Sequence, residues 1–408
     1  MRSETTPGRV SRAIDDRELR KRLRAGKSVT LVLGAGVNQS RGLPLWSELL
    51  RRTWKMVFDE DPHALEQDFL ERARNACEQA GLPGHFVERL DIKRHPLELQ
   101  FAFEQIYDSL RWRVDDLTNL QRFGKQRAKR IFRIVSKEER VAELFVEILR
   151  QLLYEGKPSV HVRRSSRLDT LALVARAVRR NAMLPEHERR ITQVITLNVD
   201  DLLERAVNLG CRRQIPWAVP ICRATQLRPI PSARCIAIYH LHGFVPLNAD
   251  IYPWHMEDGR IDKAKPPAES LVFTDEQYWR MVRNSDGFAS RVFLNALSGS
   301  CVFVGLSMTD INIMRWLAND AIERSDDFRR LASGWASSEA TFTIGEELSR
   351  HYWITEASAS GDAKEWLRGP RRRDILTTTL RRRGVERITI PSWESKAFRD
   401  WWQSCFES

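Results

Sequence analysis

The chain of 408 residues contains no apolar run that approaches the roughly 18 residues of a membrane-spanning helix. The first 13 residues are rich in Arg, Ser and Thr and include no apolar stretch of the kind that a secretory signal carries. The 6 cysteines are scattered and none forms a Cys-x-x-Cys pair, so four ligands at the spacing of a zinc ribbon are missing. These absences predict a cytoplasmic protein with reduced thiols, no membrane segment and no bound zinc.

Positive charge exceeds negative charge, with a formal net charge of +12 and an isoelectric point of about 9.7. Basic clusters include Arg17–Arg24, Arg122–Arg133 and Arg381–Arg383. Basic surfaces attract polyanions, so nucleic-acid binding is one interpretation. Acidic residues interleave with the basic ones and no recognised nucleic-acid module is present, so we favour a solvated surface.

Hydrophobic residues make up 42% of the chain, enough for a sizeable core, and four apolar segments have the length and composition of buried strands. Each is followed by glycine or polar residues at the point where the strand would end. They are Val29–Leu33 before Gly34, Ala35 and Gly36; Ile191–Leu197 before Asn198 and Asp200; Ala237–Leu241 before His242; and Cys301–Val304 before Gly305 and Ser307. In an open parallel sheet, ligands bind outside the carboxyl ends of the strands, so we expect these residues to line one crevice.

Apolar residues at spacings of three and four predict helices at Ala64–Gly81 and Lys137–Gly156, with Ser136 as the N-cap of the second. We predict an N-terminal extension at 1–27, a catalytic α/β domain at 28–390 with a helical insertion at about 47–190, and a C-terminal amphipathic helix at 391–408. The Pro-rich stretch Ile215–Pro231 predicts loops or edge strands. The aromatic face of the C-terminal helix is expected to pack on the core.

The ordered set of motifs resembles the sirtuin catalytic domain, and in particular the bacterial sirtuin-like (Sir2-like) branch of anti-phage proteins. The motifs, besides the Gly-Ala-Gly turn, are G-L-P-L-W at Gly42–Trp46, T-L-N-V-D-D-L-L-E at Thr196–Glu204, H-L-H-G at His240–Gly243, L-V-F-T-D-E-Q-Y at Leu271–Tyr278 and F-V-G-L-S-M-T-D at Phe303–Asp310. The resemblance covers roughly residues 28–50 and 190–390. It implies a Rossmann-like parallel sheet that binds NAD.

The resemblance also implies roles for the residues at the strand ends. Asn198 would order a water and the ribose, His242 would act as general base on a ribose hydroxyl, and Asp200 would accept from the nicotinamide carboxamide. Backbone N–H groups of Gly34, Ala35 and Gly36 would face phosphate, and Gly305 and Ser307 would hold the other half of the nucleotide. Asp310 is equally well explained as a ribose ligand or as the cap of a following helix. His240 points away from His242 by strand alternation and is expected to be structural.

The sequence also departs from the pattern of deacylating sirtuins. The zinc ribbon is missing, Asn38 replaces a serine, and Leu45-Trp46 replaces a Phe-Arg pair. These changes argue against protein deacylation and leave the nucleotide site intact. The resemblance then implies an NAD+ hydrolase that depletes NAD+ during phage infection. The alternatives are a deacylase or ADP-ribosyltransferase, and a non-catalytic NAD or ADP-ribose sensor.

Such an enzyme must be held inactive until it is needed, and the chain contains no Walker A motif and no clear sensor domain. We therefore expect regulation by homo-oligomerisation or by a partner protein, for which a HerA-type ATPase is a candidate.

Overall fold

The computed structural model of this protein describes the following residues: 14, 16–58, 96–115, 120–121, 125–155, 169–211, 216–222, 234–248, 255–257, 260–262, 271–274, 276–278, 281, 287–308, 310–334, 351–356 and 370–407.

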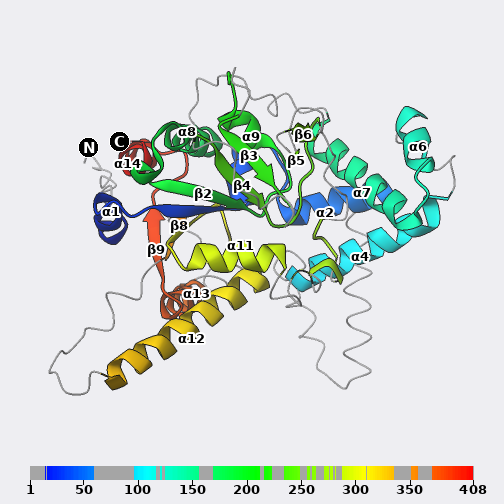
Figure 1. Ribbon diagram of the computed structural model, residues 1–408. Helices are drawn as coiled ribbons and strands as arrows, with labels where there is room; N and C mark the ends of the chain where they lie inside the picture. Colours follow the sequence, from blue (N-terminus) through cyan, green and yellow to red (C-terminus); the bar gives the residue numbers. More distant parts are fainter. Residues whose placement is uncertain are drawn as a thin grey trace, which may run out of the picture.

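A seven-stranded, all-parallel sheet forms the centre of the protein, with strands in the order β3, β4, β2, β1, β7, β8 and β9 (Figure 1). Their bounds are β1 Val29–Leu33, β2 Ile191–Thr196, β3 Ala218–Ile221, β4 Ile236–His240, β7 Cys301–Val304, β8 His351–Glu356 and β9 Val385–Ile390. β1 and β7 are buried at every position, as is typical of Val- and Leu-rich strands covered on both faces. The predicted Rossmann-like α/β fold is confirmed.

Of two further strands in the sheet, the sequence pattern indicated β3 and missed β8. β3 contains Pro220 and lies at the edge of the sheet, where a residue without an N–H group is tolerated, as the Pro-rich stretch predicted. β8 was not predicted, because its apolar run is only Tyr352–Ile354, too short for a periodic pattern. A separate antiparallel pair consists of β5 His255–Glu257 and β6 Arg260–Asp262.

Helices cover both faces of the sheet (Figure 1). One face carries α8 Thr170–Met183, α9 Leu202–Val207 and α14 Lys396–Phe406; the other carries α11 Phe288–Leu297, α12 Ile311–Gly334 and α13 Pro370–Arg382. Strand β1 shows the division, since Leu31 and Leu33 belong to the first hydrophobic cluster and Val32 to the second. None of the described helices is both long and apolar enough to cross a membrane.

Four helices between β1 and β2 form a separate layer beyond the carboxyl ends of the strands (Figure 1). They are α2 Trp46–Phe58, α4 Pro96–Arg113, α6 Lys125–Phe132 and α7 Lys137–Tyr154. Helix α7 begins as predicted, because the Ser136 hydroxyl accepts from the backbone N–H of Glu139 at 3.3 Å. The predicted helix Ala64–Gly81 lies outside the described residues. The predicted range of the insertion also takes in α8, which instead contacts β2, α9 and α14.

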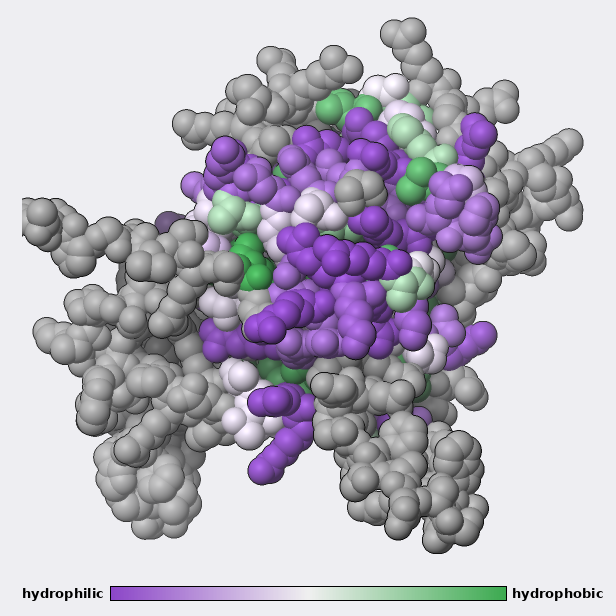
Figure 2. Space-filling view, turned by 90° about the vertical axis from the view of Figure 1, so that its left-hand side faces the viewer, coloured by the Kyte–Doolittle hydropathy of each residue, from purple (hydrophilic) through white to green (hydrophobic). Residues whose placement is uncertain are grey.

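The C-terminal helix α14 turns its aromatic face inward, which confirms the expected core packing. Phe398 and Trp402 are fully buried, and the indole N–H of Trp402 donates to the carbonyl of Leu173 in α8 at 3.2 Å. The indole N–H of Trp401 donates to the carboxylate of Asp16, next to helix α1 Arg17–Arg24. Hydrophilic side chains predominate on the side of the molecule where α1 and α14 lie (Figure 2).

Candidate functional site

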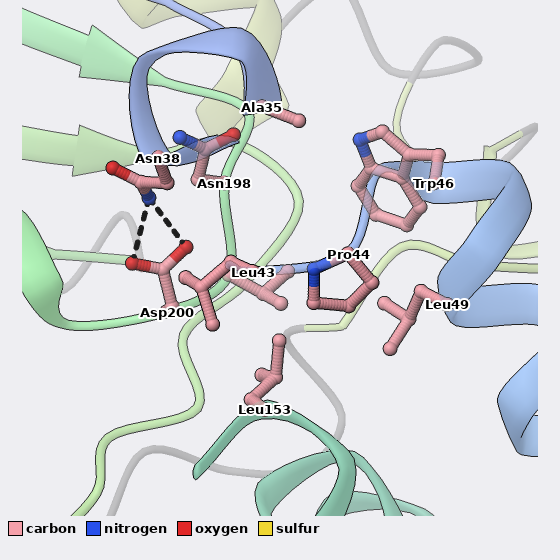
Figure 3. Close-up of a pocket in the computed structure, with 10 residues that line it drawn as sticks. Ala35, Asn38, Leu43, Pro44, Trp46, Leu49, Leu153, Asn198 and Asp200 are labelled. Carbon is pink, nitrogen blue, oxygen red and sulfur yellow. Dashed lines mark hydrogen bonds between the residues drawn. The ribbon is translucent and has the colours of Figure 1, made fainter. Parts of the chain in front are cut away.

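Four adjacent strands, β4, β2, β1 and β7, bring the polar strand ends to one edge of the sheet. The register pairs Leu33 at the end of β1 with Thr196 of β2 and with Val304 of β7. A pocket opens at this edge between the strand ends and the helical layer (Figure 3). Its lining comprises Ala35, Asn38, Leu43, Pro44, Trp46, Leu49, Leu153, Asn198, Val199 and Asp200.

Asn198 is held rigidly at the pocket. It is buried, its amide nitrogen donates to the carbonyl of Gly34 at 3.1 Å, and its backbone N–H donates to the Thr196 hydroxyl at 3.0 Å. Its Oδ1 atom is buried and has no hydrogen-bond partner among the residues that the structure describes. A buried acceptor without a partner is costly, so this atom is free to accept from a ligand.

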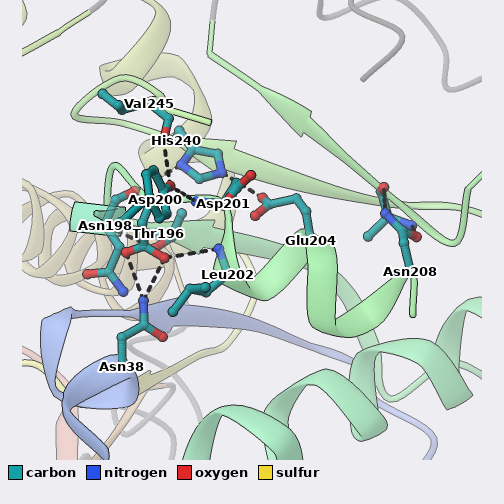
Figure 4. Close-up of polar contacts among 12 residues, drawn as sticks. Asn38, Thr196, Asn198, Asp200, Asp201, Leu202, Glu204, Asn208, His240 and Val245 are labelled. Carbon is teal, nitrogen blue, oxygen red and sulfur yellow. Dashed lines mark hydrogen bonds and ion pairs between the residues drawn. The ribbon is translucent and has the colours of Figure 1, made fainter. Parts of the chain in front are cut away.

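Asp200 is engaged by Asn38, which comes from the turn after β1 (Figures 3 and 4). The amide nitrogen of Asn38 donates to both carboxylate oxygens, at 2.8 and 2.9 Å, and the backbone N–H of Leu202 donates to Oδ1 at 3.1 Å. Burial nevertheless raises the pKa of the Asp200 carboxyl from 3.8 to about 6. Asn38 therefore compensates only in part for the removal of Asp200 from water.

The glycine turn after β1 lies against the end of β7 and the turn that follows it. The N–H groups of Gly34 and Gly36 donate to the carbonyls of Val304 and Gly305, each at 3.0 Å. Glycine is needed at position 34 because the backbone there lies close to the backbone of Gly305. A Cβ on Gly34 would lie 2.6 Å from the Gly305 carbonyl oxygen. Gly305 itself has φ +66°, and a Cβ there would lie 2.6 Å from the backbone nitrogen of Val37. In this structure these two N–H groups connect the turn after β1 to the end of β7 and to the turn that follows it, and phosphate binding by Gly34, Ala35 and Gly36 stays a prediction.

The two histidines of the H-L-H-G motif have different surroundings. His240 is buried, with Nδ1 2.9 Å from the carbonyl of Asn198 and Nε2 2.6 Å from the Glu204 carboxylate (Figure 4). Since a carbonyl only accepts, Nδ1 of His240 carries a hydrogen. The expected structural role of His240 is confirmed, and the residue fixes the backbone next to Asn198.

His242 lies among aromatic side chains. Its ring is 5.4 Å from that of Trp46 and 5.3 Å from that of Tyr278, measured between centroids. Nε2 lies 3.3 Å from the Tyr278 hydroxyl and 3.7 Å from Oδ2 of Asp310. Nδ1 is buried, and the described part of the chain offers it no hydrogen bond. Burial lowers the pKa of His242, and the carboxylate of Asp310 opposes that effect.

Asp310 meets one of the two expectations for its position, the helix cap. Its Oδ1 accepts from the backbone N–H groups of Asn312 and Ile313, at 2.9 and 3.1 Å, and so caps α12. Its second carboxylate oxygen, Oδ2, lies 3.4 Å from the Tyr278 hydroxyl. Ser307 is exposed on the turn after β7. A ribose contact of Asp310 stays a prediction.

Asp201 and Glu204, at the start of α9, contact residues outside the helix. Asp201 accepts from the backbone N–H of Leu247 at 3.0 Å, and Glu204 binds His240. It is Asp200 that accepts from an N–H group at the start of α9. Within the residues that the structure describes, no group of three or more His, Cys, Asp or Glu side chains is placed to hold a metal ion.

Three buried atoms without described partners mark where a polar ligand can bind. Asn198 Oδ1, Asn38 Oδ1 and His242 Nδ1 are buried and lack hydrogen bonds to described residues. Ribose hydroxyls and a carboxamide supply the donors and acceptors that such atoms need. Sequence reasoning assigned no role to Asn38, Trp46 or Tyr278, although each lies in a quoted motif or next to one. The motifs drew attention to these residues, but the sequence does not show in which direction their side chains point.

Comparison with known families agrees with this geometry. Residues 192–370 match the SIR2-like domain family. The matched range includes Asn198, His242 and Asp310 and leaves out β1 and its glycine turn. No curated protein matches the chain. This part of the chain is therefore similar to SIR2-like domains, whose fold uses NAD.

Replacing Asp200 by asparagine should stabilise the protein at alkaline pH. The folded-state pKa of about 6 lies above the ordinary 3.8, so ionisation of this carboxyl opposes folding as pH rises through 6 and has no effect below about 4. Asp200→Asn should therefore raise the free energy of unfolding by about 2 kcal/mol more at pH 8 than at pH 4.5. Urea unfolding at both pH values measures the difference, and an equal effect at both would contradict it.

The activity should depend on pH through His242. Burial holds its pKa below 6.5, so if the neutral imidazole is the base that the sequence predicts, kcat/KM should rise with pH to a plateau with a midpoint below 6.5. In Asp310→Asn the midpoint should move to lower pH, because the carboxylate that raises the pKa is gone and asparagine still caps the helix. A midpoint that stays in place in Asp310→Asn, or moves to higher pH, would refute the assignment of His242 as the base.

Proposed function

We infer that the protein hydrolyses NAD+ to nicotinamide and ADP-ribose. The observation that carries the proposal is a pair of buried atoms on neighbouring strand ends, Asn198 Oδ1 and His242 Nδ1, which have no hydrogen-bond partner among the described residues. The SIR2-like match supports NAD as the ligand. We also propose the division into an extension at 1–27, a catalytic domain at 28–390 and a C-terminal helix at 391–408.

In the proposed reaction the bond between the ribose C1′ and the nicotinamide nitrogen breaks, and its electron pair neutralises the pyridinium. The ribose passes through an oxocarbenium-like state that one water attacks, as in other glycosyl cleavages. Asn198 Oδ1 accepts from that water and orients it. The water's proton passes through a ribose hydroxyl to His242.

The surroundings of His242 suit a base. The Asp310 carboxylate near Nε2 favours the tautomer with the hydrogen on Nε2, which leaves Nδ1 to accept a proton. Asp200 and Asn38 would receive the carboxamide of nicotinamide. Leu43, Pro44 and Trp46 form the apolar side of the pocket and limit the entry of further water (Figure 3). Gly305, Ser307 and Ala35 would lie along the rest of the dinucleotide.

The test is to incubate the purified full chain with NAD+ and to separate the products by chromatography. Free nicotinamide and ADP-ribose in equal amounts, without an acylated peptide and in the presence of a chelator, are expected. Product formation that requires an acylated peptide and yields O-acyl-ADP-ribose would instead establish the deacylase alternative. NAD binding without any product, even at high protein concentration and with the partner protein present, would establish the sensor alternative.

We propose that the reaction serves anti-phage defence by NAD+ depletion, in the cytoplasm. The surface of the helical layer supports control through protein contacts, because Trp112 and Val135 are 84% and 95% exposed. A HerA-type ATPase is one candidate partner.

We predict that activity requires a homo-oligomer or such a partner. NADase activity per chain should therefore rise with protein concentration or on addition of the partner, in step with the mass measured by light scattering. Maximal activity of a strict monomer would contradict this prediction.

A further inference from the structure

Helix α7 of the insertion ends against the two loops that carry the candidate catalytic residues. These are the loop after β2, residues 197–201, and the loop after β4, residues 241–247. The last residue of α7, Tyr154, is buried. Its hydroxyl donates to the carbonyl of Val245 at 2.6 Å and accepts from the backbone N–H of Asp201 at 3.0 Å. One hydroxyl thus bridges both loops.

Neighbouring residues of α7 strengthen the contact. Arg150, one turn earlier, donates from Nε to the carbonyl of Pro246 at 2.9 Å. Leu153 lines the pocket together with Asn198 and Asp200 (Figure 3). The end of α7 is therefore part of the pocket wall and also a support for the loops behind it.

The two loops are also joined to each other without α7. The N–H of Val245 donates to the carbonyl of Val199 at 2.6 Å, and the N–H of Leu247 donates to the Asp201 carboxylate at 3.0 Å. What Tyr154 adds is the connection of this loop pair to the helical layer. Burial and the nearby carboxylates of Asp201 and Asp200 raise the pKa of Tyr154 well above its usual range, so the hydroxyl keeps the proton that it donates.

We propose that Tyr154 is a positioning residue through which the helical insertion sets the placement of Asn198 and His242. The inference rests on the proposed NAD+ hydrolysis. Asn198 lies three residues before Asp201, and His242 three residues before Val245, so a shift of α7 moves both catalytic side chains together. Small displacements of catalytic groups lower turnover strongly because reacting atoms must align. A partner that binds the insertion would act on catalysis by this route.

Tyr154→Phe is the test, since it removes one oxygen and retains the ring. We expect kcat for NAD+ to fall about tenfold or more, with KM unchanged within about threefold. The matched control is Tyr239→Phe in β4, whose ring contacts Phe288 and whose hydroxyl has no hydrogen bond to a described residue. The control should retain wild-type kcat. Unchanged kcat in Tyr154→Phe would overturn the proposal, and so would an equal fall in both variants.

Amide hydrogen exchange provides a second measurement that does not depend on catalysis. In Tyr154→Phe the amides of Asp201 and Leu247 should exchange about tenfold faster or more, with the sheet amides unchanged. If the wild-type protein fails to cleave NAD+ both at high protein concentration and with the partner protein present, the proposed function is wrong, and the exchange data still decide whether Tyr154 holds the loops. Unchanged exchange at Asp201 and Leu247 would overturn the positioning role.

Discussion

Replacement of Asn198 or His242 by alanine should abolish NAD+ cleavage and leave the fold intact. Asn198→Ala removes Oδ1, a buried side-chain oxygen of the pocket lining that has no hydrogen-bond partner among the described residues. This oxygen is the proposed acceptor for the attacking water. His242→Ala removes the base. Loss of a positioned base or of a water-orienting group costs about 10²–10⁴-fold in rate, so either variant should fall to near background. Release of nicotinamide under initial-rate conditions measures the effect.

A matched control separates catalysis from general damage. His187 is 81% exposed on the 3-10 helix Glu186–Glu188, far in the fold from the pocket edge, so His187→Ala should retain wild-type turnover. Near-ultraviolet circular dichroism should show native packing in all three variants. Full turnover in both Asn198→Ala and His242→Ala would show that these residues do not carry the reaction.

Trp402→Ala should cause the largest loss of stability. Trp402 is fully buried in α14, packs against Phe398, Trp401 and Phe406, and donates a hydrogen bond to Leu173. Removing the ring leaves a cavity and removes the hydrogen bond to Leu173, and such substitutions cost about 3–5 kcal/mol. The midpoint of urea unfolding should fall accordingly.

Trp112→Ala is the natural comparison, since this tryptophan of α4 is 84% exposed. Its removal should change the free energy of unfolding by less than about 0.5 kcal/mol. If both tryptophan variants unfold at the wild-type midpoint, α14 does not contribute to the core as the structure indicates.

Much of the architecture could be predicted from local pattern together with one topological rule. The apolar strands and the polar residues after them were visible in the sequence, and parallel strands place their carboxyl ends at one edge. This reasoning correctly brought Asn198, Asp200 and His242 to the same edge. The structural role of His240 followed from strand alternation alone. The amphipathic pattern of α14 likewise predicted its buried face.

The sequence by itself determined the elements, the parallel sheet and the edge at which the site forms, because these depend on short-range periodicity and chain connection. Only the tertiary structure decided which atoms remain available to a ligand. Asn38 binds Asp200 across 162 positions of the chain, and the N–H groups of Gly34 and Gly36 donate to the last residue of β7 and to the turn after it. Tyr154 reaches two loops that no local pattern connects with it. Each of these contacts depends on the direction of a side chain or on the distance between backbone segments that are remote in the chain. The periodicity of a sequence predicts neither.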